Sequence, residues 1–216
     1  MKILNLYACL GGNRYLWGDK HEITAVELDP ELARLYSERF PNDKVIVTDA
    51  HQYLLEHFKE FDFIWTSPPC PSHSRVRISQ KNRENFKAIY PSMMLYEEIL
   101  FLENYFNGKY CVENVIPFYE PLIEAQKRGR HLYWTNFTLP MNLNGRKEGI
   151  GLVGAAVQDE IGKLEAFHKI DLSTYKGIQR KDKIARNLVD YEVGKSILDI
   201  ATGLDIKDNS SQLSFI

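Results

Sequence analysis

The chain has 216 residues, of which 44% are hydrophobic and 26% are charged, and its formal net charge is −2. These values are typical of a globular protein, and they leave room for one sizeable domain with at most a small appendage. No apolar run approaches the roughly 18 residues that a membrane-spanning helix needs, so we expect a cytoplasmic protein with no membrane partner.

Strand and helix patterns alternate along residues 1–140. Short apolar runs of strand character predict strands at 2–8, 22–29, 43–49, 61–68, 108–115 and 130–139. Between them, a glycine turn opens a helix within 10–19, and helical spacing predicts helices at 30–40, 50–58, most of 85–106, and 117–126. Strands separated by helices indicate an α/β fold with a mainly parallel sheet, right-handed crossovers and helices on both faces.

The alternation weakens from Met141 to Arg186 and returns in residues 185–204, whose apolar spacing suits a helix. The last residues are polar and predict a poorly ordered tail. We therefore expect a main domain at 1–140, an appended region at 141–186, a helix at 187–204 that completes the domain, and a tail at 205–216.

The first three strands end in residues suited to an adenosine-bearing cofactor. The segment "NLYACLGG" ends in Gly11 and Gly12, and glycines let backbone amides approach a ligand closely. Glu27 follows the second strand, where a carboxylate can accept both hydroxyls of a ribose, and Asp49 ends the third. Each feature has an ordinary alternative: a simple turn, a charge at a helix N-terminus, and a helix N-cap. Together, at successive strand ends, they favour a cofactor site.

The fourth strand ends in "TSPPCPSHSR", which places Cys70 between prolines. Pro68 and Pro69 cannot continue a β-ladder and fix the local backbone, so we expect a rigid elbow beyond the strand. A lone cysteine is usually a buried structural residue, but this position suits a core poorly, and we favour a nucleophile. A nucleophilic thiolate needs a lowered pKa, which we expect nearby arginines or a helix N-terminus to supply.

The spacing of the cysteines and the clusters of basic residues give two further indications. The three cysteines show no C-x-x-C spacing, which argues against a disulfide framework and a structural zinc site, so we expect a reducing compartment and no metal. Basic residues cluster at 75–87, 127–130 and 176–186. Any one cluster is best explained as a solvated surface, whereas three beside candidate site motifs are consistent with a locally basic cleft.

Two further motifs follow the Cys70 segment. "YCVENV" ends the fifth strand with Glu113 and Asn114, and such polar groups are costly to bury without partners. "KRGRHLYWTNF" places Arg128 and Arg130 beside the sixth strand, where guanidinium groups can hold a carbonyl or phosphate oxygen.

In this order the motifs resemble those of the DNA (cytosine-5) methyltransferases, of the compact kind found in phages. The resemblance covers nearly all of residues 3–201. "NLYACLGG", "ELD" and "TD" match the cofactor motifs, "SPPCPSHS" the catalytic Pro-Cys loop, "ENV" the signature triplet, "RGRHLYWTNF" the Arg-x-Arg motif, and "RNLVDYEVGKSI" the closing motif. A Pro-Cys pair alone is a weak signal, but followed by Glu-Asn-Val and then Arg-x-Arg it is specific.

The resemblance implies a Rossmann-like class I methyltransferase fold with a very reduced target-recognition segment at 141–186. It implies methyl transfer from S-adenosylmethionine to C5 of a cytosine flipped out of double-stranded DNA, with S-adenosylhomocysteine as the product. Cys70 would attack C6, while Glu113 hydrogen-bonds the N3 edge and Arg130 holds O2. The expected setting is a bacterial or phage-infected host cell, with restriction–modification among the roles.

The site residues that the resemblance implies fall into three groups. The catalytic residues are Cys70, Glu113, Asn114 and Arg130. The cofactor-binding residues are Tyr7, which stacks on the adenine where the family usually has Phe, and Cys9, Leu10, Gly11, Gly12, Glu27, Leu28, Asp49, Pro69, Asn187 and Val189. The DNA-binding residues are Ser72, His73, Ser74, Arg75, Arg77 and Arg128, although a structural role explains His73 equally well.

Two departures from the family pattern have consequences. Cys9 replaces the first glycine of the usual motif, which strains the backbone if that position needs a positive φ. The interval 141–186 is short for target recognition, and each good bidentate base contact contributes only about 1–3 kcal/mol. We therefore expect a short or relaxed recognition sequence, or help from a homodimer.

Three alternatives stay open at this point. "TSPP" resembles the Ser-Pro-Pro-Tyr motif of amino-methyltransferases, but those enzymes need an aromatic residue where Cys70 stands. RNA could replace DNA as the substrate of the same chemistry, and the sequence does not discriminate between the two. A catalytically silent cofactor-binding partner is disfavoured because Cys70, Glu113 and Arg130 are all present.

Overall fold

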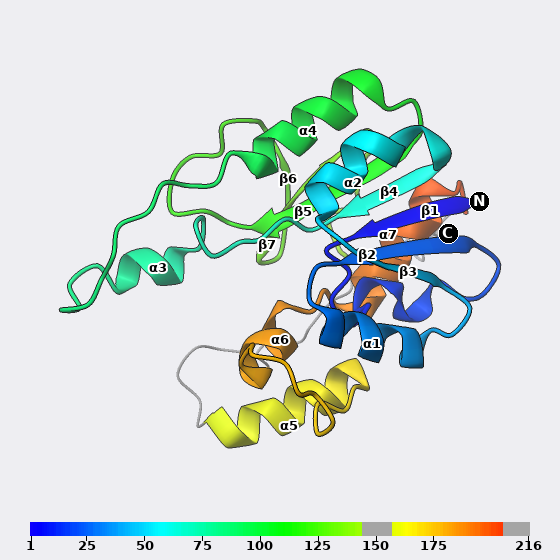
Figure 1. Ribbon diagram of the computed structural model, residues 1–216. Coiled ribbons are helices and arrows are strands. Elements are labelled where there is room, and N and C mark those ends of the chain that lie inside the picture. Colours follow the sequence, from blue (N-terminus) through cyan, green and yellow to red (C-terminus); the bar gives the residue numbers. More distant parts are fainter. Residues whose placement is uncertain (144–156, 205–216) are drawn as a thin grey trace, which may run out of the picture.

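The computed structural model describes residues 1–143 and 157–204. Within these residues, seven strands form one sheet in the order β3-β2-β1-β4-β5-β7-β6 (Figure 1). β7 (His131–Thr135) is antiparallel to β5, and β6 (Gln126–Arg128) is antiparallel to β7. The parallel strands are β1 (Lys2–Leu6), β2 (Glu22–Glu27), β3 (Lys44–Val47), β4 (Phe63–Thr66) and β5 (Lys109–Val115). The predicted mainly parallel sheet is confirmed.

Strand order fixes where a ligand can bind. β2 and β3 lie on one side of β1, whereas β4 and β5 lie on the other. The chain therefore reverses its direction of progress across the sheet between β1 and β4. In open parallel sheets, the loops that leave the carboxyl ends of the strands diverge at such a point and open a crevice.

The helices and 3-10 helices surround this sheet (Figure 1). Their bounds within the described residues are α1 (Pro30–Arg39), α2 (Ala50–His57), α3 (Arg75–Ser79), α4 (Met94–Tyr105), α5 (Val157–His168), α6 (Lys181–Asn187), α7 (Tyr191–Ala201), η1 (Asn13–Leu16) and η2 (Phe58–Glu60).

The alternation of side chains along the strands shows which face of the sheet each helix covers. Leu4 and Leu6 of β1 pack with α2 and α4 on one face. Ile3 of the same strand packs with α7 on the other face, and Ala25 of β2 packs there with Tyr36 of α1. Because successive side chains of a strand point to opposite faces, one buried strand supports both layers. The expected helices on both faces are therefore confirmed.

The region from 141 to 186 is more regular than its sequence pattern predicted. α5 and most of α6 lie in it, where we expected irregular chain. Leu164 of α5 and Ile184 of α6 are buried with Leu10, Leu32 and Leu35, so both helices pack against the loop after β1 and the outer side of α1. Long-range packing of a few apolar residues stabilises these helices, and a local pattern does not reveal it.

Other element predictions were wrong in detail, mostly at prolines. The helix expected over most of 85–106 begins only at Met94, after Pro91, and residues 117–126 contain no helix because Pro117 and Pro121 interrupt the segment. The single helix expected for the C-terminal segment is two, α6 and α7, separated by residues 188–190. The tail at 205–216 and part of the expected recognition region, 144–156, lie outside the described residues.

None of the helices described in residues 1–143 and 157–204 has the length and apolar character needed to cross a membrane. In the same part of the chain, no three His, Cys, Asp or Glu side chains come together in a way that suits a metal ion.

Candidate active site

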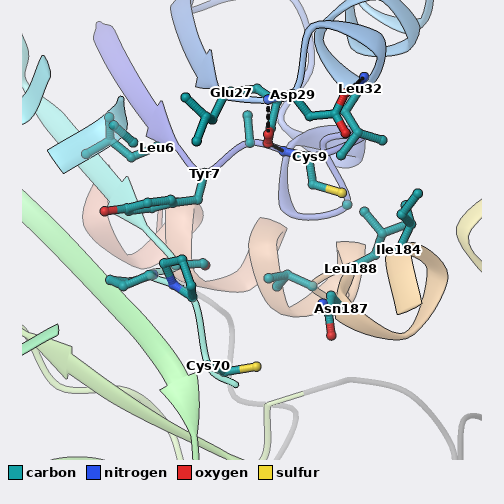
Figure 2. Close-up of a pocket in the computed structure, with 18 of the residues that line it drawn as sticks. Leu6, Tyr7, Cys9, Glu27, Asp29, Leu32, Cys70, Ile184, Asn187 and Leu188 are labelled. Atoms are coloured by element: carbon teal, nitrogen blue, oxygen red, sulfur yellow. Dashed lines mark hydrogen bonds between the residues drawn. The ribbon is translucent and has the colours of Figure 1, made fainter. Parts of the chain in front are cut away.

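A cavity of about 880 Å³ opens at the carboxyl ends of β1, β2, β4 and β5 (Figure 2). The other wall comes from the C-terminal part of the chain, between Gly177 and Val189. Tyr7 and Glu27 lie at one end of the view in Figure 2 and Cys70 at the other. Many predicted residues line this cavity: Tyr7, Cys9, Gly12, Glu27, Leu28, Asp49, Pro69, Cys70, Glu113, Asn114, Arg130, Asn187 and Val189.

The loop after β1 has a strained backbone. Tyr7 has a φ of 55° and Cys9 a φ of 47°, both in the left-handed region that disfavours residues with a Cβ. Two backbone hydrogen bonds hold the loop, from the Ala8 amide to Val26 at 3.0 Å and from the Gly11 amide to Ala8 at 2.8 Å. Cys9 therefore occupies a position that does need a positive φ, at a cost of about 1–2 kcal/mol.

The thiol of Cys9 is not a reactive group. Burial, followed by the negative charge of Glu27, raises the pKa of Cys9 to about 12. A thiol with that pKa stays protonated at neutral pH and behaves as a small apolar side chain. The residue instead contributes its backbone amide, which donates to Glu27 Oε2 at 2.8 Å.

The two predicted glycines have different functions. Leu10 and Gly11 do not line the cavity, and a Cβ on Gly11 would lie 2.5 Å from the ring of Phe40. A Cβ on Gly12 would lie 2.3 Å from the carbonyl oxygen of Val189. Gly12 thus allows the C-terminal segment to close directly on the first loop, and Gly11 allows helix α1 to pack beneath that loop.

Glu27 is fixed at the end of β2 by backbone amides. Its Oε2 accepts from Cys9, and its Oε1 accepts from the Asp29 amide at 2.9 Å (Figure 2). Burial raises the pKa of Glu27, although these two amide hydrogen bonds act in the opposite direction. The carboxylate is therefore oriented before any ligand arrives, with acceptor lone pairs left on both oxygens.

Asp49 and Tyr7 complete the end of the cavity near Glu27. Asp49 is the N-cap of α2, and its Oδ1 accepts from the Gln52 amide at 2.8 Å, so the N-cap explanation and the cavity position hold together. The ring of Tyr7 lines the cavity, while its hydroxyl donates to Glu98 of α4 at 2.5 Å.

Sequence reasoning missed a wall of the cavity built from the segment 171–180. Gly177, Ile178 and Gln179 line the cavity there. The segment is tied to Asp29, whose Oδ2 accepts from the Tyr175 hydroxyl and from Gln179 Nε2, both at 3.0 Å. No local pattern marked these residues, because the contacts join positions about 150 residues apart in sequence. Part of the region expected to recognise the target therefore closes the cavity beside Glu27.

The Cys70 elbow is held by hydrogen bonds as well as by prolines. Asn114 Nδ2 donates to the Pro68 carbonyl at 2.9 Å, and Asn114 Oδ1 accepts from the Val115 amide at 2.9 Å. The amides of His73 and Ser74 donate to the Cys70 carbonyl at 2.9 and 3.1 Å. Asn114 thus ties the end of β5 to the loop that presents the thiol, which is a positioning contact.

The pKa of Cys70 is shifted opposite to our expectation. Burial, followed by the negative charge of Glu113, raises it, and Lys183 of α6 lowers it by a smaller amount. The expected arginines are engaged elsewhere, because Arg75 donates to the Pro117 carbonyl at 3.1 Å and Arg77 to the Lys87 carbonyl. The thiol is therefore protonated in this state, and the cation that acts on it, Lys183, belongs to the basic cluster at 176–186 and not to the arginines that follow Cys70.

The side chains that follow Cys70 support the loop. Ser72 Oγ accepts from the Ser92 amide at 3.0 Å, and Ser74 Oγ accepts from the Val76 amide at the start of α3. His73 is 1% exposed, and its Nδ1 lies 2.5 Å from the Tyr119 hydroxyl. Burial lowers the pKa of His73, which keeps the ring neutral. A structural role thus accounts for these contacts, while their part in DNA binding stays a prediction.

Glu113 and Arg130 line the cavity from β5 and from the turn that precedes β7. Glu113 of β5 is 7% exposed and lies 3.5 Å from His131 Nε2, a partner that the sequence did not indicate. Arg130 lies in the turn between β6 and β7, after Gly129 with a φ of 55°. Arg128, two residues earlier, is not in the cavity lining and donates to the carbonyls of Leu139 and Pro140.

Gln126 organises this corner of the sheet, and sequence reasoning gave it no role. Its Nε2 donates to Thr135 Oγ1 at 2.7 Å and to the Phe137 carbonyl at 2.8 Å. Its Oε1 accepts from the Leu139 amide at 2.8 Å and from Arg128. The contacts of Gln126 and Arg128 fix the strand ends from which Arg130 projects.

Comparison with known structures identifies the fold. A methyltransferase of Entamoeba histolytica, EhMeth, superposes with a TM-score of 0.55 over 94% of this chain and 98% of that chain, at 10% identity. A mutant of DNMT2 from Spodoptera frugiperda aligns at 27% identity and a TM-score of 0.39, covering 53% of this chain and 35% of that chain. TrmN from Thermus thermophilus aligns at 17% identity and a TM-score of 0.34, covering 53% of this chain and 33% of that one. The first of these supports the Rossmann-like class I methyltransferase fold.

Sequence comparison identifies the family. The chain spans about a third of the Spodoptera protein that it matches. A comparison with curated proteins found no significant match. The family model for C-5 cytosine-specific DNA methylases matches residues 1–116, more than half of the chain, and this range includes Glu27, Cys70 and Glu113. The chain therefore belongs to the C-5 cytosine-specific DNA methylase family.

Proposed function

We propose that the chain is a DNA (cytosine-5) methyltransferase that uses S-adenosylmethionine and forms a covalent bond between Cys70 and C6 of a flipped-out cytosine. One observation carries the proposal: Cys70, Glu113 and Arg130 line the same cavity as Glu27 and Tyr7. The proposed nucleophile and its polar partners thus line the same cavity as the two residues suited to bind an adenosine. Family membership supports the same chemistry.

The cavity fits the cofactor. Its volume of about 880 Å³ lies in the range of ordinary ligand pockets. Glu27 presents a preoriented carboxylate for two ribose hydroxyls, the ring of Tyr7 offers a stacking surface, and Asp49 offers a carboxylate for an exocyclic amine. When bound, S-adenosylmethionine supplies an electrophilic methyl group on a sulfonium.

The residues around Cys70 suit a nucleophilic addition to a pyrimidine. As the S–C6 bond forms, the thiol proton passes by way of the Glu113 carboxylate to N3, so that C5 becomes an enamine-type nucleophile. Arg130 holds O2, where negative charge would otherwise build up. After C5 takes the methyl group, the C5 proton leaves to solvent, the S–C6 bond breaks, and the N3 proton returns through Glu113 to the sulfur. The net products are 5-methylcytosine and one proton.

The raised pKa of Cys70 has a place in this mechanism. Burial and the charge of Glu113 keep the thiol protonated before substrate enters. Hydrogen bonding of Glu113 to the cytosine edge spreads its negative charge away from the sulfur, and the thiolate then becomes easier to form. Nucleophile activation is thereby coupled to a base in the pocket, which protects the thiol from unproductive reactions.

Target recognition is proposed to be short or relaxed. Residues 157–187 pack on α1 and the cavity, so much of the region expected to read DNA already has another function. In the described part of that region, these packing contacts leave fewer side chains for base edges, and each good base contact is worth about 1–3 kcal/mol. Methylation confined to one fixed site of six or more base pairs would contradict this part of the proposal.

The test is covalent trapping. Duplexes of randomised sequence containing 5-fluorocytosine are incubated with the protein and S-adenosylmethionine, because the fluorine blocks the elimination that frees Cys70. We expect a denaturation-resistant protein–DNA adduct, lost in Cys70→Ser and retained in Cys111→Ala, which removes a thiol buried in the core instead. A parallel arm with 5-fluorocytosine in RNA distinguishes the nucleic acid. No adduct with folded protein in either arm would refute the carbon-5 mechanism, and an adduct with RNA alone would replace DNA as the substrate.

A further inference from the structure

A buried carboxylate lies behind the cofactor end of the cavity. Glu98 of α4 is fully buried, with 0% exposure. It accepts from the Tyr7 hydroxyl at 2.5 Å and from Thr66 Oγ1 at 2.6 Å, and His51 Nδ1 lies 3.1 Å from the oxygen that Tyr7 uses. Carboxylates are almost never buried unless partners satisfy them, and here three partners from β4, α2 and the loop after β1 converge on one side chain.

Tyr7 is the one of these partners that also faces the cavity. Its backbone sits in the left-handed region, with a φ of 55°, so the main chain alone does not favour its orientation. Strained conformations persist where the surroundings over-determine them. The hydrogen bond to Glu98 is such a constraint, because it pins the far end of the ring while β1 pins the near end.

His51 strengthens the constraint from the other side of the carboxylate. Its Nε2 lies 3.4 Å from Glu97 of α4, and Asp49 at the start of α2 also acts on it. Hydrogen bonding to Glu98 raises the pKa of His51, which favours the imidazolium form beside the buried negative charge. The Tyr7 hydroxyl in turn has a raised pKa, caused by burial and by Glu98, so it stays a donor.

We propose that Glu98 is a positioning residue for the cofactor: it acts through the hydroxyl of Tyr7 to hold that ring at the angle the adenine needs. This inference rests on the proposed function, because it assigns the adenine of S-adenosylmethionine to the ring of Tyr7. On this account the hydroxyl of Tyr7, which a phenylalanine would lack, has a function in this chain. It also extends the cofactor site to α4, which contributes only Met94 to the cavity lining.

A double-mutant cycle tests the inference, with the dissociation constant of S-adenosylmethionine measured by calorimetry. Tyr7→Phe keeps the ring and removes the hydroxyl, and Glu98→Gln keeps the shape and removes the charge. We expect each single variant to bind the cofactor about tenfold more weakly, equivalent to about 1.4 kcal/mol. If Glu98 acts through Tyr7, Glu98→Gln has little further effect in the Tyr7→Phe background.

Thr66→Val is the matched control. It removes the other hydroxyl donor from the same carboxylate, and Thr66 does not line the cavity. We expect it to lower the thermal stability of the cofactor-free protein while changing the dissociation constant less than twofold. Should Glu98→Gln fail to fold, the comparison of Tyr7→Phe with Thr66→Val still decides the question, since each removes one hydroxyl from Glu98.

The outcomes separate this inference from the proposed function. Additive effects of Tyr7→Phe and Glu98→Gln, or equal effects of Thr66→Val and Tyr7→Phe on binding, would overturn the positioning role alone. Failure of the unmodified protein to bind S-adenosylmethionine would overturn both proposals.

Discussion

The two walls of the cavity are built in different ways. One wall consists mostly of residues at or just after the carboxyl ends of the parallel strands β1 to β5, together with Arg130 in the turn between β6 and β7. The other wall, from Gly177 to Val189, is held by long-range contacts with α1 and with the first loop. The first wall carries the proposed chemical groups, whereas the second encloses them. The comparison shows that part of the segment where target recognition was expected instead closes the cavity that we propose as the cofactor site.

The largest effect is expected where the two walls touch. A Cβ on Gly12 would lie 2.3 Å from the Val189 carbonyl, and the backbone cannot yield without moving the C-terminal segment. We expect Gly12→Ala to weaken cofactor binding about tenfold or more, in line with the 1–3 kcal/mol typical of overpacking. Calorimetry measures the binding. Gly162→Ala, in α5 at a position with no positive φ and open space around it, is the control for adding a Cβ to a glycine. Unchanged binding in Gly12→Ala would show that the walls do not depend on each other.

Opposite charges on the two walls should move the reactivity of Cys70 in opposite directions. Glu113 raises the pKa of Cys70 and Lys183 lowers it. At a pH below that pKa the thiolate fraction grows as the pKa falls, so Glu113→Gln should speed alkylation by iodoacetamide several-fold, and Lys183→Met should slow it by a smaller factor. Mass spectrometry of the Cys70 peptide, followed from pH 7 to 10, measures the rates. Shifts of the same sign in both variants would contradict this account.

A moderate effect is expected where the second wall is tied to Asp29. Tyr175→Phe removes the hydroxyl that donates to Asp29 Oδ2, and a hydrogen bond to a charged group is worth about 1.5–3 kcal/mol, less where solvent reaches it. We expect cofactor binding to weaken about fivefold, together with a fall of a few degrees in the unfolding temperature. Ser173→Ala, in the same segment, is the control. A fall in stability without a change in binding would make this wall a scaffold only.

The smallest effect concerns the first wall alone. Cys9 lies at a φ of 47°, where glycine is favoured and β-branched residues are not. We expect Cys9→Gly to change the free energy of unfolding by less than about 1 kcal/mol, since relief of strain offsets the lost side chain, and Cys9→Val to lower it by more than 1 kcal/mol. Urea denaturation measures both. A valine variant as stable as the glycine variant would show that the loop adapts its backbone.

The sequence was informative where chemistry follows directly from a strand. Glu27, Asp49, Cys70 and Glu113 each come at or near the end of a strand, so a short apolar run and its end were enough to place them on one edge of the sheet. The α/β fold followed from the same alternation. Asn187 and Val189 were named only through the family resemblance, because no local pattern connects the C-terminal segment to the first loop.

The rest depended on contacts between distant positions. Glu98 lies in the middle of an ordinary amphipathic helix, and only its hydrogen bond to Tyr7, 91 residues away in sequence, gives it significance. Gln179 reaches Asp29 across 150 residues. The direction of the Cys70 pKa shift likewise depends on burial and on the nearby charge of Glu113. Neither can be read from the arginines that follow Cys70 in the sequence. Helix α5 was missed because its stability comes from burying Leu164 against other elements.

The contact between Gly12 and Val189 also sets an order of events during synthesis. Chains emerge from the ribosome N-terminus first, and the five parallel strands are all complete by Val115. A nascent chain of that length carries Glu27, Cys70 and Glu113, yet it lacks the segment that closes over the first loop. Its proposed catalytic residues are therefore present without the second wall of the cavity, and we expect the chain to hold a cofactor only after some 70 further residues have been translated and α6 has docked.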